Sequence, residues 1–260
     1  MFLEEITAHT RVVLARRKKD VPLPGLKKQA GERARPLKLS AALTWNGVRL
    51  ICEVKKASPS RGIICPVFNP AVAARRYAAG GAAAISILTE ERWFQGSLEH
   101  LRAVRETLGS RLPVLRKDFI LDPYQVYEAR AYGADALLLI VAILTPRELK
   151  NLLAISHELG MECLVEAHDE AEVETAVASE AKIIGVNNRD LKTFQVDLSV
   201  TWRLLPLIPP DRVVVAESGI RTRADVLRMQ ALGVDAVLVG EALMGAPDVT
   251  AKLKELNGQG

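Results

Sequence analysis

The segment "EARAYGADALLLI" (residues 128–140) joins the end of a helical pattern to a run of apolar residues, and "LRMQALGVDAVLVG" (227–240) repeats the arrangement. Gly133 and Gly233 stand where each helix should stop, because glycine readily adopts the left-handed conformation that ends many helices. A looser third copy, "RRYAAGGAAAISIL", covers 75–88. A repeated unit of helix, glycine and strand predicts a chain in which helices and strands alternate.

The same alternation extends from residue 49 toward the C-terminus. Most of the apolar runs are uninterrupted, as is typical of strands buried on both faces. We expect strands at 49–55, 82–89, 113–118, 135–141, 161–167, 182–188, 212–218 and 235–241, with helices between them, such as those at 70–79, 97–108, 123–132, 146–159, 169–178 and 222–232. Eight strand–helix units predict an α/β fold, the (β/α)8 or TIM barrel. A doubly wound fold would need a GxGxxG turn after the first strand, and the sequence has none there.

We expect a single domain over residues 1–260, with the barrel at 49–260 and an N-terminal helical extension of one or two helices at 1–48. With 49% hydrophobic and 25% charged residues, the composition is that of a soluble globular protein. No apolar run approaches the roughly 20 residues of a membrane helix, and the first residues lack a signal-peptide core. We therefore expect a cytoplasmic protein with no membrane partner.

The charge and the cysteines exclude other classes of function. The net charge of +4 is modest, and the basic run at 16–19 lacks aromatic or glycine interleaving. We interpret this run as a solvated helix end, not as a nucleic-acid arm. Cys52, Cys65 and Cys163 form no CxxC pair, and the four histidines have no HxxxH spacing. We expect reduced thiols and no metal site.

Polar residues follow the expected strands at one end of the barrel, where active sites of this fold lie. They are Glu53 and Lys55, Arg116, Lys117 and Asp118, Glu166, Asn187, Asn188 and Arg189, and Glu217 and Ser218. Barrel mouths are wet and need polar groups in any case, so one such residue alone proves little. Lysines and glutamates from several strands at one rim are typical of a proton-transfer site.

The stretch "EVKKASPSRG" (53–62) indicates which side chains of the first strand point into the pocket. Glu53 and Lys55 are two residues apart and share one face, so we expect both in the pocket. Cys52 and Lys56 alternate with them and should point away from it. Later, "SGI" at 218–220 and "VGE" at 239–241 carry glycines that let backbone N–H groups approach a phosphate, and a short helix should begin at the end of the second.

Six stretches resemble the indole-3-glycerol-phosphate synthase family and together span most of the chain. They are "EVKKASPSRG" (53–62), "YAAGGAAAISILTEERWFQGSLEHL" (77–101), "PVLRKDFILDPYQVYEARAYGADALLLI" (113–140), "LVEAHDEAE" (164–172), "IGVNNRDLKTFQVD" (184–197) and "VVAESGI" (214–220). The first, third and fifth are specific to the family. The resemblance implies ring closure of 1-(2-carboxyphenylamino)-1-deoxyribulose 5-phosphate with loss of carbon dioxide and water. The substrate is a small anion with a phosphate and a carboxylate, and no cofactor is implied.

The resemblance also implies roles for individual residues. Lys117 would be the general acid, Lys55 would face the substrate carboxylate and assist dehydration, Glu166 would be the base with Glu53 as its partner, and Asn187 would hold a sugar hydroxyl. Ser58, Ser218, Gly219 and Gly240 would form the phosphate side, Arg189 would support the mouth, Glu217 would contact substrate, and Phe94, Phe119 and Pro59 would flank the aromatic ring. An ordinary serine–proline turn is the alternative for Ser58, and core packing is the alternative for Phe119.

Three positions depart from the family pattern. Asn69 replaces a frequent aspartate and should still cap a helix, and Cys52 replaces a frequent alanine. Glu241 replaces the serine of some members, and we assign it no binding role because a carboxylate would repel phosphate.

Two other functions remain possible from the sequence. Phosphoribosylanthranilate isomerase resembles this chain at the phosphate site, but it uses a first-strand cysteine and a sixth-strand aspartate, where this chain has asparagines. A catalytically inactive barrel that binds a phosphorylated metabolite or a partner protein should lack some of the acidic and basic residues that catalysis needs, and we find none missing. We expect a monomer or weak homo-oligomer whose N-terminal helix covers the mouth.

Overall fold

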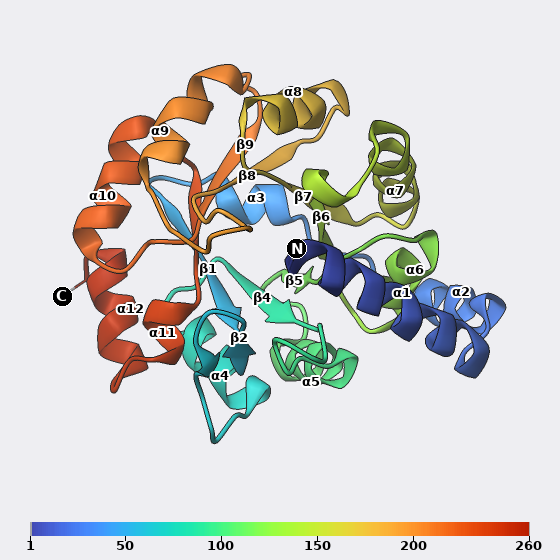
Figure 1. The fold of residues 1–260 in the computed structure, drawn as a ribbon. Helices are drawn as coiled ribbons and strands as arrows, with labels where there is room; N and C mark the ends of the chain where they lie inside the picture. The colour runs from blue at the N-terminus through green and yellow to red at the C-terminus, as the bar shows by residue number, and fades with distance from the viewer. Residues whose placement is uncertain (1, 260) are drawn as a thin grey trace.

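Eight parallel strands close into a barrel in the computed structural model, which describes residues 2–259 (Figure 1). Hydrogen bonds join the strands in the order β1-β10-β9-β8-β7-β6-β5-β4, and β4 pairs with β1 to complete the ring. The strands are β1 (Arg49–Val54), β4 (Ala84–Leu88), β5 (Val114–Lys117), β6 (Ala136–Ile140), β7 (Glu162–Ala167), β8 (Ile183–Asn187), β9 (Val213–Glu217) and β10 (Ala236–Val239). Each lies within a range expected from the sequence, so the (β/α)8 fold is confirmed.

Helices surround the ring of strands. They are α4 (Pro70–Ala79), α5 (Leu98–Leu108), α6 (Pro123–Ala131), α7 (Pro146–Glu158), α8 (Glu170–Ala178), α9 (Ser199–Leu204), α10 (Arg223–Leu232) and α12 (Val249–Asn257), with the short α11 (Glu241–Met244), η1 (Val141–Ile143) and η2 (Leu205–Leu207). The sequence analysis did not predict α9 or α12. The former has six residues and no side-chain cap, whereas the latter begins at a capping aspartate that could have identified it. Within residues 2–259 no helix is both long and apolar enough to cross a bilayer.

Local chemistry sets the helix ends, as predicted for Asn69 and Gly233. The Asn69 side chain accepts a hydrogen bond from the backbone N–H of Val72 at the start of α4, and Thr145 forms a capping box with Glu148 at the start of α7. Gly233 ends α10 with a φ of +90°, in the left-handed region that glycine tolerates best. The repeated glycines of the sequence therefore mark helix ends.

Apolar side chains form two concentric layers. One layer lies between the strands and the outer helices and includes Cys52, which confirms that this cysteine points away from the barrel interior. The other fills the interior and includes Ile51 of β1 and Leu115 of β5. The alternation of facing along each strand thus separates the packing layer from the interior.

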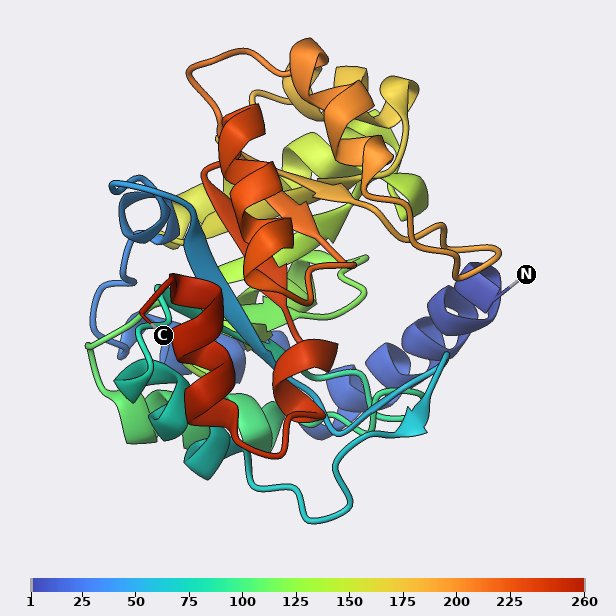
Figure 2. The same cartoon turned by 90° about the vertical axis from the view of Figure 1, so that its left-hand side faces the viewer.

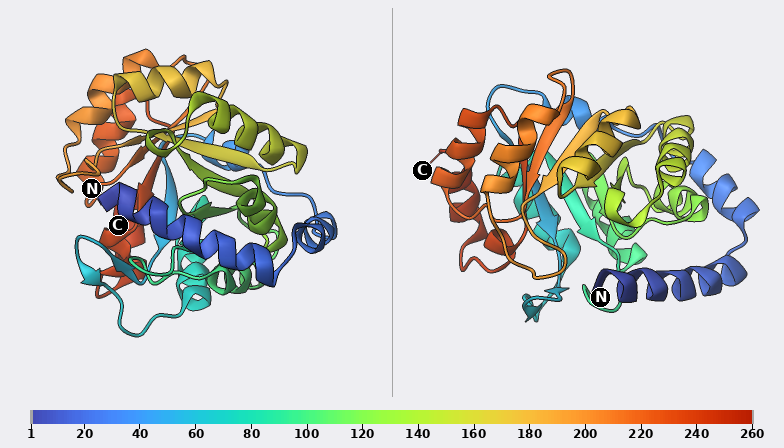
Figure 3. Two further views of the ribbon diagram at one scale, coloured as in Figure 1. Left: turned by 45° about the vertical axis from the view of Figure 1, so that its right-hand side comes forward. Right: turned by 45° about the horizontal axis from the view of Figure 1, so that its top comes forward.

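Three helices, not the expected one or two, precede the barrel: α1 (Phe2–Asp20), α2 (Leu23–Gly31) and α3 (Leu39–Leu43). The sequence analysis underestimated their number because α3 has only five residues and no side-chain cap. Leu39 and Leu43 of α3 join the interior layer at the amino end of the barrel. Figures 2 and 3 show α1 at the opposite end, where the strands terminate.

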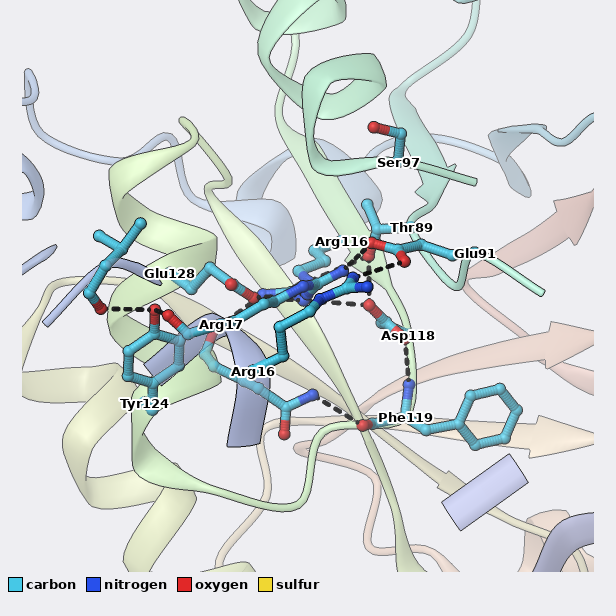
Figure 4. A network of polar contacts seen from close by, with 12 residues as sticks. Arg16, Arg17, Thr89, Glu91, Ser97, Arg116, Asp118, Phe119, Tyr124 and Glu128 are labelled. Atoms are coloured by element: carbon cyan, nitrogen blue, oxygen red, sulfur yellow. Dashed lines mark hydrogen bonds and ion pairs between the residues drawn. The ribbon is translucent and has the colours of Figure 1, made fainter. Parts of the chain in front are cut away.

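A buried ionic network fastens α1 to the barrel (Figure 4). The guanidinium of Arg17 lies 3.1 Å from Glu128 of α6 and 2.6 Å from Glu91 in the loop after β4. The Tyr124 hydroxyl donates a hydrogen bond to the Arg17 carbonyl oxygen at 2.9 Å. The interpretation of residues 16–19 as a solvated helix end is therefore wrong for Arg17, although Arg16 is largely exposed.

Arg116 belongs to the same network and not to the barrel mouth, where the sequence analysis placed it. It is fully buried, and its guanidinium pairs with Glu128 at 2.8 Å and with Asp118 at 3.0 Å. The reason is the pleat of β5, which points Lys117 into the barrel and its neighbour Arg116 outward toward α6.

Replacement of Arg17 tests whether this network holds α1. Arg17→Ala should lower the free energy of unfolding by roughly 1–3 kcal/mol, because buried Glu128 loses one of its two cationic partners. Arg16→Ala is the matched control and should cost less than about 1 kcal/mol, because its pair with Glu91 is exposed. Equal losses by chemical denaturation would contradict the docking role of Arg17.

Candidate active site

A pocket opens at the carboxyl ends of the strands, and Phe2 and Leu3 of α1 line it. Side chains that point inward near the carboxyl ends of the strands form its charged and polar floor. They are Glu53 of β1, Lys117 of β5, Glu166 of β7, Asn187 of β8 and Glu217 of β9. The predicted candidates therefore converge from five different strands on one cavity, as the fold requires of an active site.

A lysine between two carboxylates is the centre of this pocket. Lys117 Nζ lies 2.9 Å from Glu166 Oε2 and 3.2 Å from Glu217 Oε2, and both carboxylates are only 2% exposed. Burial would lower the pKa of Lys117, but the charges of Glu166, Glu217 and Glu53 outweigh it and raise that pKa well above its usual range.

The two carboxylates differ in protonation. Burial would raise the pKa of Glu166, but Lys117 and His168 outweigh it and hold that pKa well below its usual range. Burial raises the pKa of Glu217 to about 8, and the negative charge of Glu166 adds to this effect against the attraction of Lys117. Near neutral pH the site thus combines an ionised carboxylate, an ammonium and a neutral carboxylic acid, which suits proton transfer.

Lys55 follows β1 and enters the same cavity. Its Nζ lies 2.7 Å from Glu53 Oε1, so the pair shares the pocket as their spacing predicted. Lys56 is not among the residues that line the pocket, which agrees with the predicted alternation.

One end of the pocket is built from loops. Ser58, Ser218, Gly219 and Gly240 lie there together with Arg189. Ser218 and Gly219 have φ values of +65° and +85°, an unusual pair of left-handed residues that turns the loop after β9. Asn188 holds this loop, because its amide donates to the carbonyl oxygen of Glu217 at 3.0 Å.

Ser58 lies in a small hairpin that the sequence analysis did not predict. Its strands are β2 (Ala57–Ser58) and β3 (Gly62–Ile63), each only two residues long and therefore without a detectable alternation. The Ser58 side chain is buried, and its hydroxyl lies 3.4 Å from that of Ser60. The hairpin thus brings two hydroxyl groups to the pocket wall.

Two glycines make room for the buried carboxylates. A side chain at Gly185 would collide with Glu217 Oε1, and one at Gly240 would collide with Glu53 Oε1. Gly240 was predicted only as part of the phosphate side, and Gly185 was not predicted at all. A glycine inside the strand run "KIIGVNN" (182–188) was the usable signal, because it commonly marks a close approach by another group.

Glu241 begins α11, as predicted, and its carboxylate is taken up by two arginines. It lies 2.8 Å from Arg189 and 3.3 Å from Arg61. These pairs offset its negative charge next to the loops that carry the glycines.

Aromatic side chains enclose the pocket. The rings of Phe94 and Phe119 line it with their centroids 6.3 Å apart. Phe2 of α1 lines it as well and packs edge-to-face against Trp93 and Phe194. As expected, the N-terminal helix covers the mouth.

His168 is a neighbour of the site that the sequence analysis missed. Its Nε2 lies 3.2 Å from Glu166 Oε1. The i, i+2 spacing of Glu166 and His168 on one face, the same spacing that identified Glu53 and Lys55, was the available signal.

Comparisons with known proteins agree with this geometry. A family model described as indole-3-glycerol phosphate synthase matches residues 3–256. A protein of that name from Dehalococcoides mccartyi is 57% identical over 258 residues, which cover 98% of this chain and 100% of the relative. Another from Roseiflexus sp. is 48% identical over 264 residues, covering 99% of this chain and 98% of the relative.

Solved structures with similar folds have low sequence identity and show the fold alone. Thiamine phosphate pyrophosphorylase from Pyrococcus furiosus has a TM-score of 0.62 at 20% identity and covers 81% of this chain and 94% of its own. 3-Hexulose-6-phosphate synthase from Salmonella typhimurium has a TM-score of 0.63 at 15% identity, with 81% and 97% covered.

The raised pKa of Glu217 predicts a pH-dependent stability. The usual value of 4.5 applies to the unfolded chain, so between pH 4.5 and 8 unfolding releases a proton and stability falls as pH rises. Glu217→Gln cannot ionise and should escape this loss. Its free energy of unfolding relative to the wild type should rise by at least ~2 kcal/mol from pH 5 to pH 8.

Glu174→Gln on the exposed surface of α8 is the control, and its stability difference should stay constant with pH. A constant difference for Glu217→Gln as well, measured by denaturant unfolding, would show that Glu217 ionises normally in the folded protein.

Proposed function

The chain belongs to the indole-3-glycerol phosphate synthase family, and we propose that Lys117 is the general acid that closes the indole ring in its pocket. The enzyme is a carboxy-lyase of tryptophan biosynthesis. The substrate of this proposal is 1-(2-carboxyphenylamino)-1-deoxyribulose 5-phosphate, which cyclises and loses carbon dioxide and water. The observation that carries the proposal is the Lys117 ammonium between two buried carboxylates.

Ring closure requires a proton on the ribulose carbonyl oxygen as the aromatic ring carbon attacks the carbonyl carbon. Lys117 is protonated, lies at the pocket floor and can donate to an oxygen placed above it. Ionised Glu166 holds Nζ at 2.9 Å and so keeps the ammonium in place at the pocket floor. The carbonyl oxygen thereby becomes a hydroxyl group, which leaves as water in the last step.

Decarboxylation follows at the attacked ring carbon and restores aromaticity. The carboxylate must be held in place without being stabilised more than the transition state that loses it. Lys55 suits this task, because its charge is already shared with Glu53 at 2.7 Å. Its attraction for the substrate carboxylate is therefore moderated.

Dehydration needs an acid for the departing hydroxyl group and a base for the neighbouring proton. Glu166 is the base in this proposal, with Glu53 as its partner, and Lys55 assists the departure of water. Glu217 lines the pocket and contributes as a neutral acid in contact with the substrate.

The remaining residues bind the substrate in this proposal. The backbone N–H groups around Ser218, Gly219 and Gly240 and the hydroxyl of Ser58 hold the phosphate, with Arg189 supporting the mouth. Phe94, Phe119 and Pro59 flank the aromatic ring, and Asn187 holds a sugar hydroxyl.

The isomerase alternative finds no support at these positions. Its first-strand cysteine would have to face the pocket, but Cys52 lies in the outer packing layer. The sixth strand carries Asn187 where that enzyme needs an aspartate. We also propose a cytoplasmic monomer or weak homo-oligomer that binds no nucleic acid. It uses no cofactor in this proposal, because ring closure, decarboxylation and dehydration need only the acids, bases and charges of side chains.

A direct assay tests the proposed acid. The wild-type protein should convert the carboxyphenylamino-deoxyribulose phosphate with a rise in indole absorbance. Lys117→Ala should lower kcat by roughly 10²–10⁴-fold and keep the fold. A folded Lys117→Ala protein with near-normal turnover would move the acid role to Lys55.

Lys55 and Lys56, which point to opposite sides at the end of the first strand, provide a matched pair of variants for a second test. Lys55→Ala should lower kcat/KM by at least about tenfold, because Lys55 is inside the pocket. Lys56→Ala should keep kcat and KM close to wild type. The reverse pattern in steady-state kinetics would mean that the register of β1 is wrong.

A further inference from the structure

His168 lies behind Glu166, on the side away from Lys117. Glu166 directs Oε2 at Lys117 Nζ, 2.9 Å away, and Oε1 at His168 Nε2, 3.2 Å away. The imidazole does not line the catalytic pocket and instead borders a separate groove beneath α1. His168 can therefore act on the reaction only through Glu166.

Glu172 fixes the orientation of the imidazole. Its Oε2 accepts a hydrogen bond from the backbone N–H of His168 at 2.9 Å and lies 2.9 Å from the ring Nδ1. Glu172 is itself placed at the start of α8, where its backbone N–H donates to the capping carboxylate of Asp169. The Glu172 carboxylate, in the first turn of α8, thus contacts both the backbone and the ring of His168 and fixes the ring orientation.

In a neutral imidazole only one ring nitrogen carries a proton, so a proton on Nδ1 leaves none on Nε2. A carboxylate at 2.9 Å accepts from Nδ1, so a neutral imidazole would direct the bare lone pair of Nε2 at Glu166 Oε1. Two lone pairs at 3.2 Å repel each other, whereas a protonated ring forms an ion pair with each of the two carboxylates. The arrangement therefore favours the imidazolium.

We propose that His168, locked by Glu172, is a positioning residue that keeps Glu166 ionised and directs its Oε2 at Lys117. The inference rests on the proposed role of Glu166 as the base. A chain of alternating charges then runs from Glu172 through His168 and Glu166 to Lys117, which also contacts the neutral Glu217.

The protonation of His168 follows from these neighbours. Burial would lower the pKa of the imidazole, but the carboxylates of Glu166 and Glu172 outweigh it and raise that pKa to about 10. Apart from Glu172, the groove presents four cations, Arg11, Arg189, Lys192 and Arg203, and four anions, Glu4, Asp169, Asp190 and Asp197. The groups that raise the pKa of His168 are the two carboxylates in contact with the ring, Glu166 and Glu172.

The test compares two amides at one position. The Gln side chain of His168→Gln can place an N–H near the original Nε2 and so donate to Glu166, whereas the shorter side chain of His168→Asn reaches only Glu172. At pH 7 His168→Asn should lower kcat at least about tenfold with KM nearly unchanged, and His168→Gln should recover most of the loss.

The acidic limb of the kcat–pH profile is the readout that a purely structural role would not move. Loss of the imidazolium raises the pKa of Glu166, so the base is protonated at higher pH. The limb should shift upward by about one pH unit in His168→Asn, the effect of one charge-assisted hydrogen bond. Glu172→Gln should shift it in the same direction, and it provides the test if His168→Asn does not fold.

Glu166→Gln separates this inference from its premise. If Glu166→Gln is inactive while His168→Asn keeps wild-type kcat and acidic limb, the positioning role fails and the base assignment stands. Equal losses in His168→Asn and His168→Gln with an unmoved limb would also overturn it. Wild-type turnover in Glu166→Gln would remove the base assignment and this inference together.

Discussion

Lys117, Glu166 and Glu217 come from three different strands and meet within 3.2 Å at the closed floor of one pocket. Buried ions are costly unless each has a partner of opposite charge, so ionised Glu166 and Lys117 depend on each other, and Glu217 stays there as a neutral acid. Parallel strands in a closed ring supply the partners, because their inward-facing positions reach the same level. A slip of one residue in β5 or β7 would turn one charge of the Lys117–Glu166 pair outward and leave the other unpaired.

Other features follow from the need to hold these charges in a small, covered space. Gly185 and Gly240 carry no side chain where buried carboxylates pass. The N-terminal helix covers the mouth, and exclusion of water strengthens every electrostatic interaction beneath it. Arg17 fastens that helix to a network that includes Arg116, the residue next to Lys117 on β5 (Figure 4). Helix α1 is therefore fastened to the network of Arg116, and the proposed acid Lys117 is the next residue of the same strand.

The sequence was sufficient for the barrel, because uninterrupted apolar runs and helix-ending glycines are local signals. It was also sufficient for Glu53 and Lys55, whose shared face follows from spacing alone. It failed for Arg116, because two adjacent basic residues at a strand end differ only in facing, and for Arg17, because Glu128 is far away in the sequence. Very short elements such as α3 and the β2–β3 hairpin have no periodicity to detect.

The central claim is that Lys117, and not Lys55, protonates the ribulose carbonyl oxygen. A crystal structure with an unreactive substrate analogue, in which that carbonyl is reduced to a hydroxyl group, tests it most directly. The account predicts that the hydroxyl oxygen lies within hydrogen-bond distance of Lys117 Nζ, roughly 2.7–3.2 Å. A hydroxyl group bound instead to Lys55, with Lys117 still enclosed by Glu166 and Glu217, would contradict it.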